Sequence, residues 1–109
     1  MTRTSSDQLH GMLDLLVLKA LEEKPLHGYA IALRLERLSN DVLSVEEGSL
    51  YPALYRMEAR GWLSSTWGVT ERGRRARFYR LSRAGRAQLA AETASWARLA
   101  GAVKSVLAG

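Results

Sequence analysis

The sequence predicts a mainly α-helical fold with one small β-hairpin. Three observations lead to this prediction: apolar residues recur at helical spacing on both sides of residues 62–81, that intervening segment has the features of two strands, and 109 residues suffice for one compact domain. Hydrophobic residues make up 47% of the chain and charged residues 25%, so disorder of the whole chain is excluded.

The first helix is predicted from about Asp7 to Leu21, and it is apolar around most of its circumference. A helix of this kind is buried on more than one side. Because a chain of this size has little surface with which to cover it twice, the pattern favours coverage by a partner subunit. A central helix in the core of a monomer is the alternative.

A second helix is predicted from about Leu26 to Ser39, and Pro25 separates it from the first. A third helix ends near Gly61, and its apolar residues have the i, i+3, i+4, i+7 spacing of one face; they are Leu50, Ala53, Leu54 and Met57. Ser44 and Glu47 have the spacing of a capping box.

The start of the third helix is ambiguous because of Pro52. A helix interior rejects proline, whereas the first turn tolerates it. Either the regular helix begins close to Ser49, or it kinks at Pro52, and the sequence leaves both alternatives open.

A β-hairpin is predicted after the third helix. Residues 62–67 are rich in aromatic and hydroxyl side chains, residues 68–73 form a glycine-containing turn, and residues 76–81 form the return strand. Because an isolated hairpin is marginally stable, we expect it to pack on the helices.

The last helix is predicted from its N-cap Ser82 toward Leu107. Its apolar residues follow a heptad, which is typical of a short coiled coil and is interrupted by Glu92; they are Leu89, Trp96, Leu99, Val103 and Val106. The order of helix, helix, helix, strand, strand, helix predicts a winged helix-turn-helix over residues 1–81 and a C-terminal dimerisation helix over residues 82–109.

The net charge of +5 is concentrated in the second half of the chain. Residues 1–60 hold seven Lys and Arg against nine Asp and Glu, a balance of −2, whereas residues 61–109 hold nine against two, a balance of +7. A local cationic patch favours a polyanionic partner such as nucleic acid. A solvated basic loop is the alternative.

The third helix and the hairpin carry the residues expected to contact duplex DNA. On the helix, hydroxyl and guanidinium groups that bond phosphates or base edges lie opposite the apolar stripe, on Ser49, Tyr51, Tyr55 and Arg56. On the hairpin, four arginines would neutralise phosphates: Arg72, Arg74, Arg75 and Arg77. For the tyrosines, packing against the hairpin is the alternative.

Four runs of residues, in this order and at this spacing, resemble the signature of the PadR transcriptional regulators: Leu26–Ile31, Gly48–Glu58, Gly61–Leu63 and Gly73–Leu81. The resemblance covers roughly residues 8–90 and is to the short subfamily with a single C-terminal helix. It implies a homodimeric repressor on a palindromic operator, with the Ser49–Arg56 face in the major groove and the Arg72–Arg77 segment on the flanks.

The resemblance also implies dimerisation through the first and last helices, with an interface expected at Leu9, Met12, Leu13, Leu16, Leu89, Trp96, Leu99, Val103 and Val106. Family members commonly release DNA when they bind a small, often aromatic effector. Trp96 matches a position that stacks flat ligands, with Met12 and Leu16 beside it. Interface packing is the alternative role for Trp96, and Ala100 stands where the multidrug-binding example has an acid.

No enzymatic chemistry is predicted. The absence of cysteine excludes disulfides and thiolate ligands, and His10 and His27 lack metal-ligand spacing, so we expect no cofactor and no metal. No signal peptide or membrane helix is visible, and a cytoplasmic location is expected. The competing functions are a winged-helix module that binds protein and a ligand sensor in which DNA binding is incidental.

Overall fold

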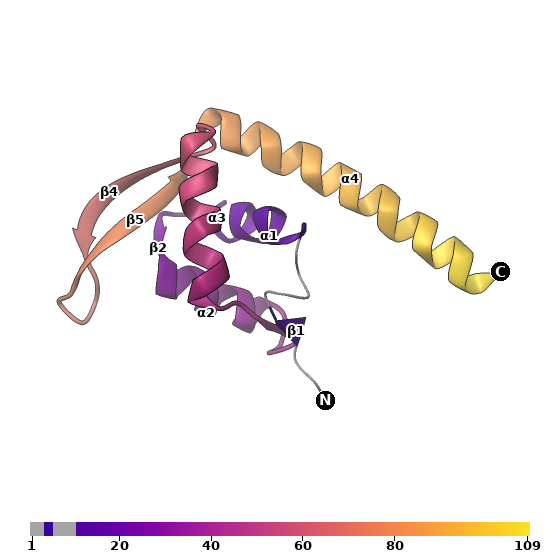
Figure 1. Ribbon diagram of the computed structural model, residues 1–109, viewed down its shortest axis with the longest axis horizontal. Coiled ribbons are helices and arrows are strands. Elements are labelled where there is room, and N and C mark those ends of the chain that lie inside the picture. Colours follow the sequence, from indigo (N-terminus) through magenta and orange to yellow (C-terminus); the bar gives the residue numbers. More distant parts are fainter. Residues whose placement is uncertain (1–3, 6–10) are drawn as a thin grey trace.

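The computed structural model describes residues 4–5 and 11–109. The described residues form four helices, α1 (Leu13–Ala20), α2 (Gly28–Leu38), α3 (Glu47–Ala59) and α4 (Arg83–Ala108). They also form the strands β1 (Thr4–Ser5), β2 (Leu26–His27), β3 (Leu43–Ser44), β4 (Leu63–Val69) and β5 (Arg75–Leu81). Helices α1 to α3 make the body, from which the β4–β5 hairpin extends on one side and α4 on the other (Figure 1).

The predicted fold class and the order of the main elements are confirmed. Three strands of two residues each were not predicted. Strand β2 pairs antiparallel with β5, opposite Tyr79 and Phe78, and gives a sheet of order β2-β5-β4, while β1 pairs in parallel with β3. Such short strands arise from pairing between distant segments, so no local periodicity indicates them.

Helix boundaries differ from the predictions at two places. Helix α1 begins at Leu13 and not at Asp7, and residues 7–10 of the predicted helix lie outside the described residues. The capping box was wrong, because Ser44 lies in β3 and the N-cap of α3 is Glu46, whose side chain makes no capping hydrogen bond.

Helix α3 begins two residues before Ser49 and continues through Pro52. Its first turn is closed by the Leu50 amide, which donates to the Glu46 carbonyl at 2.9 Å. Proline has no N–H to donate to the Gly48 carbonyl, so its presence forgoes one bond near the helix start. At the other end, Gly61 with φ +80° follows the C-cap Arg60, as the sequence indicates.

The core lies between the three body helices and the base of the hairpin. The predicted inward face of α3 is buried as expected, and Ile31 of α2 and Tyr79 of β5 are completely enclosed with it. Much of the wide apolar arc of α1 is covered within the chain itself, at Leu13, Val17, Leu18, Ala20 and Leu21. For this part of the arc, the alternative given above holds: these residues are covered by the core of the monomer and need no partner subunit.

A compact joint connects the hairpin to α4. Ser82 is the N-cap of α4, as predicted, because its Oγ accepts from the Gly85 amide at 3.0 Å. The same hydroxyl donates to the Gly61 carbonyl at 2.5 Å. Gly85 packs so tightly that a Cβ there would overlap the backbone carbonyl oxygen of Trp62.

We expect Gly85→Ala to destabilise the protein, because a backbone carbonyl cannot move aside as a flexible side chain can. The free energy of unfolding should fall by about 1–3 kcal/mol, measured by urea denaturation. The matched control is Gly101→Ala in the same helix, where a Cβ meets no atom within 4 Å. That variant should gain roughly 0.5–1 kcal/mol from helix propensity. Equal effects of the two substitutions would contradict the tight joint.

Candidate nucleic-acid interface

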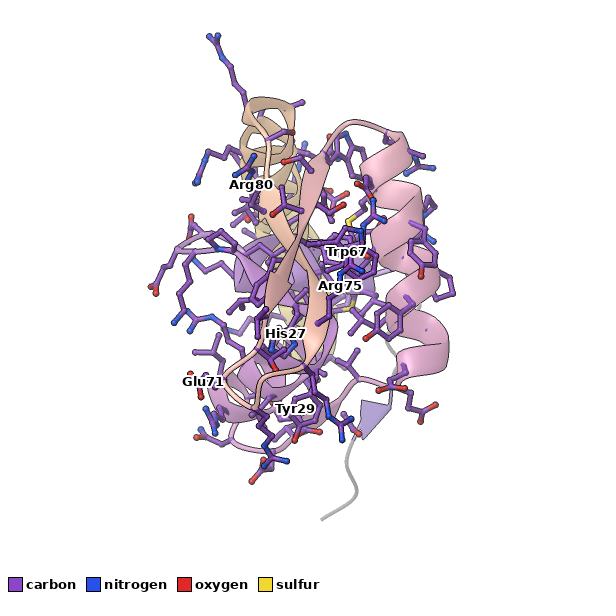
Figure 2. The ribbon with its side chains drawn as sticks, turned by 90° about the vertical axis from the view of Figure 1, so that its left-hand side faces the viewer. His27, Tyr29, Trp67, Glu71, Arg75 and Arg80 are labelled. Carbon is purple, nitrogen blue, oxygen red and sulfur yellow. The ribbon has the colours of Figure 1, made fainter. Side chains whose placement is uncertain are left out.

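The exposed side of α3 and the hairpin lie next to each other on one side of the molecule (Figure 2). Of the residues predicted on α3, Tyr55 is 59% exposed, and Ser49 and Tyr51 are half-buried. The rings of Tyr51 and Tyr55 lie 6.4 Å apart between their centroids. The helix therefore presents hydroxyl groups of Ser and Tyr along one side.

Tyr51 is held in place by the start of α2. Its phenol oxygen lies 2.6 Å from the position that a Cβ on Gly28 would occupy, so only glycine leaves room for this ring. Burial raises the pKa of Tyr51, and the nearby Glu47 and Tyr55 raise it further. The phenol consequently stays protonated at neutral pH and keeps an O–H that can be donated to an acceptor such as a phosphate oxygen.

Arg56 is bound within the chain. Its Nη2 lies 2.5 Å from Oδ1 of Asp14, and this ion pair joins α3 to α1. Asp14, with 19% of its side chain exposed, is thereby a satisfied polar group. The sequence placed Arg56 with Ser49 and the tyrosines on one outward face, but the structure directs its guanidinium toward α1.

The tip of the hairpin is a tight loop with two free cations. The Thr70 amide donates to the Arg74 carbonyl at 2.8 Å, the Arg74 amide donates to Thr70 Oγ1 at 3.2 Å, and Gly73 adopts φ +79° to close the turn. Within residues 4–5 and 11–109, the exposed side chains of Arg72 and Arg74 have no ion-pair or hydrogen-bond partner. These cations are available to an external anion.

Arg75 and Arg77 belong to a different group, organised around Trp67. The guanidinium carbon of Arg75 lies 4.6 Å from the Trp67 ring centroid, and that of Arg77 lies 5.7 Å from it. Trp67 is 58% exposed, and Figure 2 shows it with Arg75 between the hairpin and α3. Cation–π contacts of this kind restrain the planes of the two arginines.

Arg77 is also hydrogen-bonded toward α3. Its Nε donates to Ser65 Oγ at 2.7 Å, and its Nη2 lies 3.6 Å from Oε2 of Glu58. Ser65 Oγ in turn donates to the same Glu58 oxygen at 2.5 Å. The structure thus divides the four predicted wing arginines into two that are free and two that are restrained.

Sequence reasoning missed Trp67, Ser65 and Glu58 as members of this site. A signal was present, because strand alternation counted from the buried Leu63 places Ser65 and Trp67 on one face. The hairpin register, which sets Trp67 opposite Arg77, was needed to bring the arginines to that face.

His27 has a structural role. Its Nδ1 accepts from the Ala30 amide at 3.3 Å and caps α2, and its ring stacks on Tyr29 at 6.5 Å. His10 lies outside the described residues. Within the described part of the chain, no group of three His, Asp or Glu side chains could hold a metal ion. None of the helices in that part combines the length and apolar character needed to cross a bilayer.

The outer part of α4 leaves large apolar side chains uncovered. The exposed fractions are 42% for Trp96, 57% for Leu99, 48% for Val103 and 78% for Val106. Two other residues predicted at the dimer interface, Leu13 and Leu89, are buried in the core of the same chain. Leu9 lies outside the described residues. Met12, the N-cap of α1, and Leu16 on that helix are half-buried.

An open groove of about 690 Å³ separates α1 from α4. Its apolar lining comes from Leu15, Leu89, Ala90, Ala94 and Ala97, and its rim carries Lys19, Glu22 and Arg86. The hydrogen bond from Lys19 lowers the pKa of the Glu22 carboxyl, so that the rim remains charged. None of the three residues predicted to bind an effector, Trp96, Met12 and Leu16, is among those lining the groove.

Comparison with protein families identifies the chain. The model of the transcriptional regulator PadR-like family matches residues 17–91, which include α2, α3 and the whole hairpin. The chain belongs to this family. It is therefore a PadR-like transcriptional regulator, of a family that regulates transcription and is not enzymatic.

Relatives and solved structures agree with the PadR assignment. A transcriptional regulator from Mycobacterium tuberculosis is 40% identical over 74 residues, which are 68% of this chain and 65% of that protein. A PadR-like regulator from Bacillus cereus superposes with a TM-score of 0.79 at 26% identity, covering 94% of this chain and 98% of that one. A PadR family regulator from Eggerthella lenta gives 0.75 at 30% identity, covering 94% and 87%.

Proposed function

We propose that this PadR-like regulator is a repressor that binds duplex DNA as a homodimer. The observation that carries the proposal is a pair of cations, Arg72 and Arg74, at the tip of a hairpin beside the hydroxyl-bearing side of α3; neither has a side-chain partner among the described residues. A helix fits the major groove of B-DNA, and a cationic hairpin beside it reaches the flanking phosphates. Residues 1–81 would form the DNA-binding unit.

Within this proposal the individual residues have different roles. Ser49, Tyr51 and Tyr55 would bond phosphates or base edges in the major groove. Arg75 would contact phosphate from its place on Trp67. Arg56 would read a base only in a bound state in which it leaves Asp14, and the ion pair would otherwise fix α3 against α1.

The homodimer is proposed because α4, within the predicted dimerisation segment 82–109, carries an apolar heptad whose outer members are exposed. A second copy of α4 would cover Trp96, Leu99, Val103 and Val106, and α1 would contribute Met12 and Leu16. A dimer sets two recognition helices at a fixed spacing, which matches a palindromic operator. Because chromosomal DNA is the target, the protein would act in the cytoplasm.

Relief of repression by a small aromatic effector is a second part of the proposal. It is supported by the exposed indole of Trp96 and, separately, by the apolar groove between α1 and α4, which Trp96 does not line. An aromatic ligand bound there would contact the helices that hold the two subunits and would alter the spacing of the recognition helices. Quenching of Trp96 fluorescence, absent in a Trp96→Phe variant, would identify such a ligand.

Selection of bound duplexes from a random pool at about 0.15 M salt tests the proposal. We expect an inverted repeat whose half-site centres lie one helical turn of about 10 base pairs, or a multiple of it, apart. A pool that remains random after several rounds would contradict sequence-specific recognition. A single unrepeated motif would contradict the dimer while keeping the DNA-binding role.

A further inference from the structure

A connected set of side chains fastens the hairpin to α3. Glu58 of α3 accepts from Ser65 of β4, and Arg77 of β5 donates to Ser65 and lies beside Glu58. We call these three residues the strut. All three residues belong to this chain, and the cluster lies at the surface, with side-chain exposures of 28% for Glu58 and 44% for Arg77.

The strut marks the boundary between the packed and the unpacked parts of the hairpin. On its inner side, Leu63, Tyr79 and Leu81 are buried in the core. On its outer side, the same face continues with Trp67 and Val69, which are 58% and 67% exposed. A two-stranded hairpin has little stability of its own. The contacts at this boundary, together with the pairing of β2 with Phe78 and Tyr79 of β5, therefore bear on the angle at which its outer half leaves the body.

The Nε of Arg77 is bonded to Ser65 and its Nη2 lies beside Glu58, whereas Arg72 and Arg74 have none of their side-chain donors occupied within the described part of the chain. A phosphate contact that drew the guanidinium of Arg77 away from the body would break its bond to Ser65 and its ion pair with Glu58. The carboxylate of Glu58 would also face the DNA without its cation, and it would repel the phosphates.

We propose that Arg77 is a positioning residue and not a phosphate contact. With Ser65 and Glu58 it fixes the angle between the hairpin and α3, so that the arginines of the tip reach the backbone while α3 occupies the groove. This inference rests on the DNA-binding function proposed above. It gives a role in operator specificity to three residues that need not touch DNA. The reason is that recognition requires the hairpin and α3 to be in place at the same time.

Removal of the acid distinguishes this role from a simple electrostatic one. Glu58→Gln deletes a negative charge and the ion pair with Arg77, so electrostatics alone predicts tighter binding. A strut predicts the opposite for the selected operator, because the hairpin loses its fixed angle. The matched control is Glu71→Gln, which deletes an exposed charge at the tip of the same hairpin (Figure 2).

The experiment measures dissociation constants of the full chain for the selected operator and for random duplex across a range of salt. We expect Glu58→Gln and Arg77→Lys each to weaken operator binding roughly threefold to tenfold, with little change on random DNA or in the salt slope. The double variant should be impaired no more than either single one. Glu71→Gln should tighten both duplexes, and Arg74→Ala should weaken both and flatten the slope by about 0.9 for each phosphate that is no longer neutralised.

Tighter operator binding by Glu58→Gln, or unchanged binding by Arg77→Lys, would overturn the inference and make Arg77 an ordinary phosphate contact. Equal losses on operator and random DNA would overturn it too. If Arg74→Ala leaves DNA binding unaltered while the strut variants lose selectivity, the proposed role of the hairpin tip is contradicted. The positioning role of the strut is then still supported. Ser65→Ala keeps every charge and serves as a second test where a charge variant does not fold. It should show the same loss of selectivity for the operator.

Discussion

Substitution of aspartate for both Leu99 and Val103 is expected to separate the proposed dimer into folded monomers and to reduce affinity for the selected operator at least about 100-fold. Leu99 and Val103 are 57% and 48% exposed in the protomer, so the protomer loses little packing when they are replaced. In the proposed dimer, each aspartate would place a carboxylate in the apolar interface between the two α4 helices. Because one half-site holds a subunit far less tightly than two linked ones, loss of association also costs DNA binding.

Sedimentation at micromolar concentration measures the association, and circular dichroism checks that the helices persist. Ser105→Asp is the matched control, because it adds a charge of the same kind to α4 outside the heptad and removes only a hydroxyl bonded to Gly101 within that helix. It should leave both the mass and the affinity of the protein close to those of the unmodified chain. A double variant that still sediments as a dimer would place the interface elsewhere.

Neutralising the two free cations of the hairpin tip, by Arg72→Gln with Arg74→Gln, is expected to weaken binding to every duplex on the order of 100-fold at ~0.1 M salt. These side chains make no internal bonds among the described residues, so stability should be unchanged. For each phosphate that is no longer neutralised, the protein releases one counterion fewer when it binds DNA. The plot of log affinity against log salt should therefore flatten by roughly 0.9 per phosphate.

Arg37→Gln with Arg98→Gln is the control for charge, since it removes two exposed cations from the end of α2 and from α4, away from the hairpin. Gel shifts at several salt concentrations should give this variant a slope close to that of the unmodified chain. If the two double variants behaved alike, the wing would contribute through net charge and not through contact. A loss confined to the operator would instead show that these arginines read sequence.

Prediction from sequence worked where the determining interactions are local. The inward face of α3 and the Ser82 cap involve residues within a few positions of one another, and both are found as expected in the described chain. The helix predicted to follow Ser82 is likewise found, as α4. Prediction failed at β2 and β3, which depend on strands from distant segments, and at the Ser44 capping box. The spacing of Ser44 and Glu47 fits a capping box, but Ser44 pairs in a strand and does not cap α3.

The composition of the candidate site was predicted in part, without Trp67, Ser65 and Glu58, and its organisation was not predicted. All four hairpin arginines and the α3 tyrosines were named from the sequence, since residue type and strand position suffice for that. Which of them are free was not predictable. Arg56 is paired with Asp14, 42 residues away, and Arg77 with Glu58 across the hairpin base. Trp67 acquires its two arginines only through the hairpin register.

The amino-acid sequence on its own determined the helical faces, the cationic hairpin and the apolar heptad, because each follows from the periodicity and chemistry of neighbouring residues. The tertiary structure alone decided that Leu13 and Leu89 are enclosed while Val103 is exposed, and that Arg72 and Arg74 are free, within the described residues, while Arg56 and Arg77 are bound. The physical reason is that burial and ion pairing depend on distances through space, which are fixed only when remote segments have packed together.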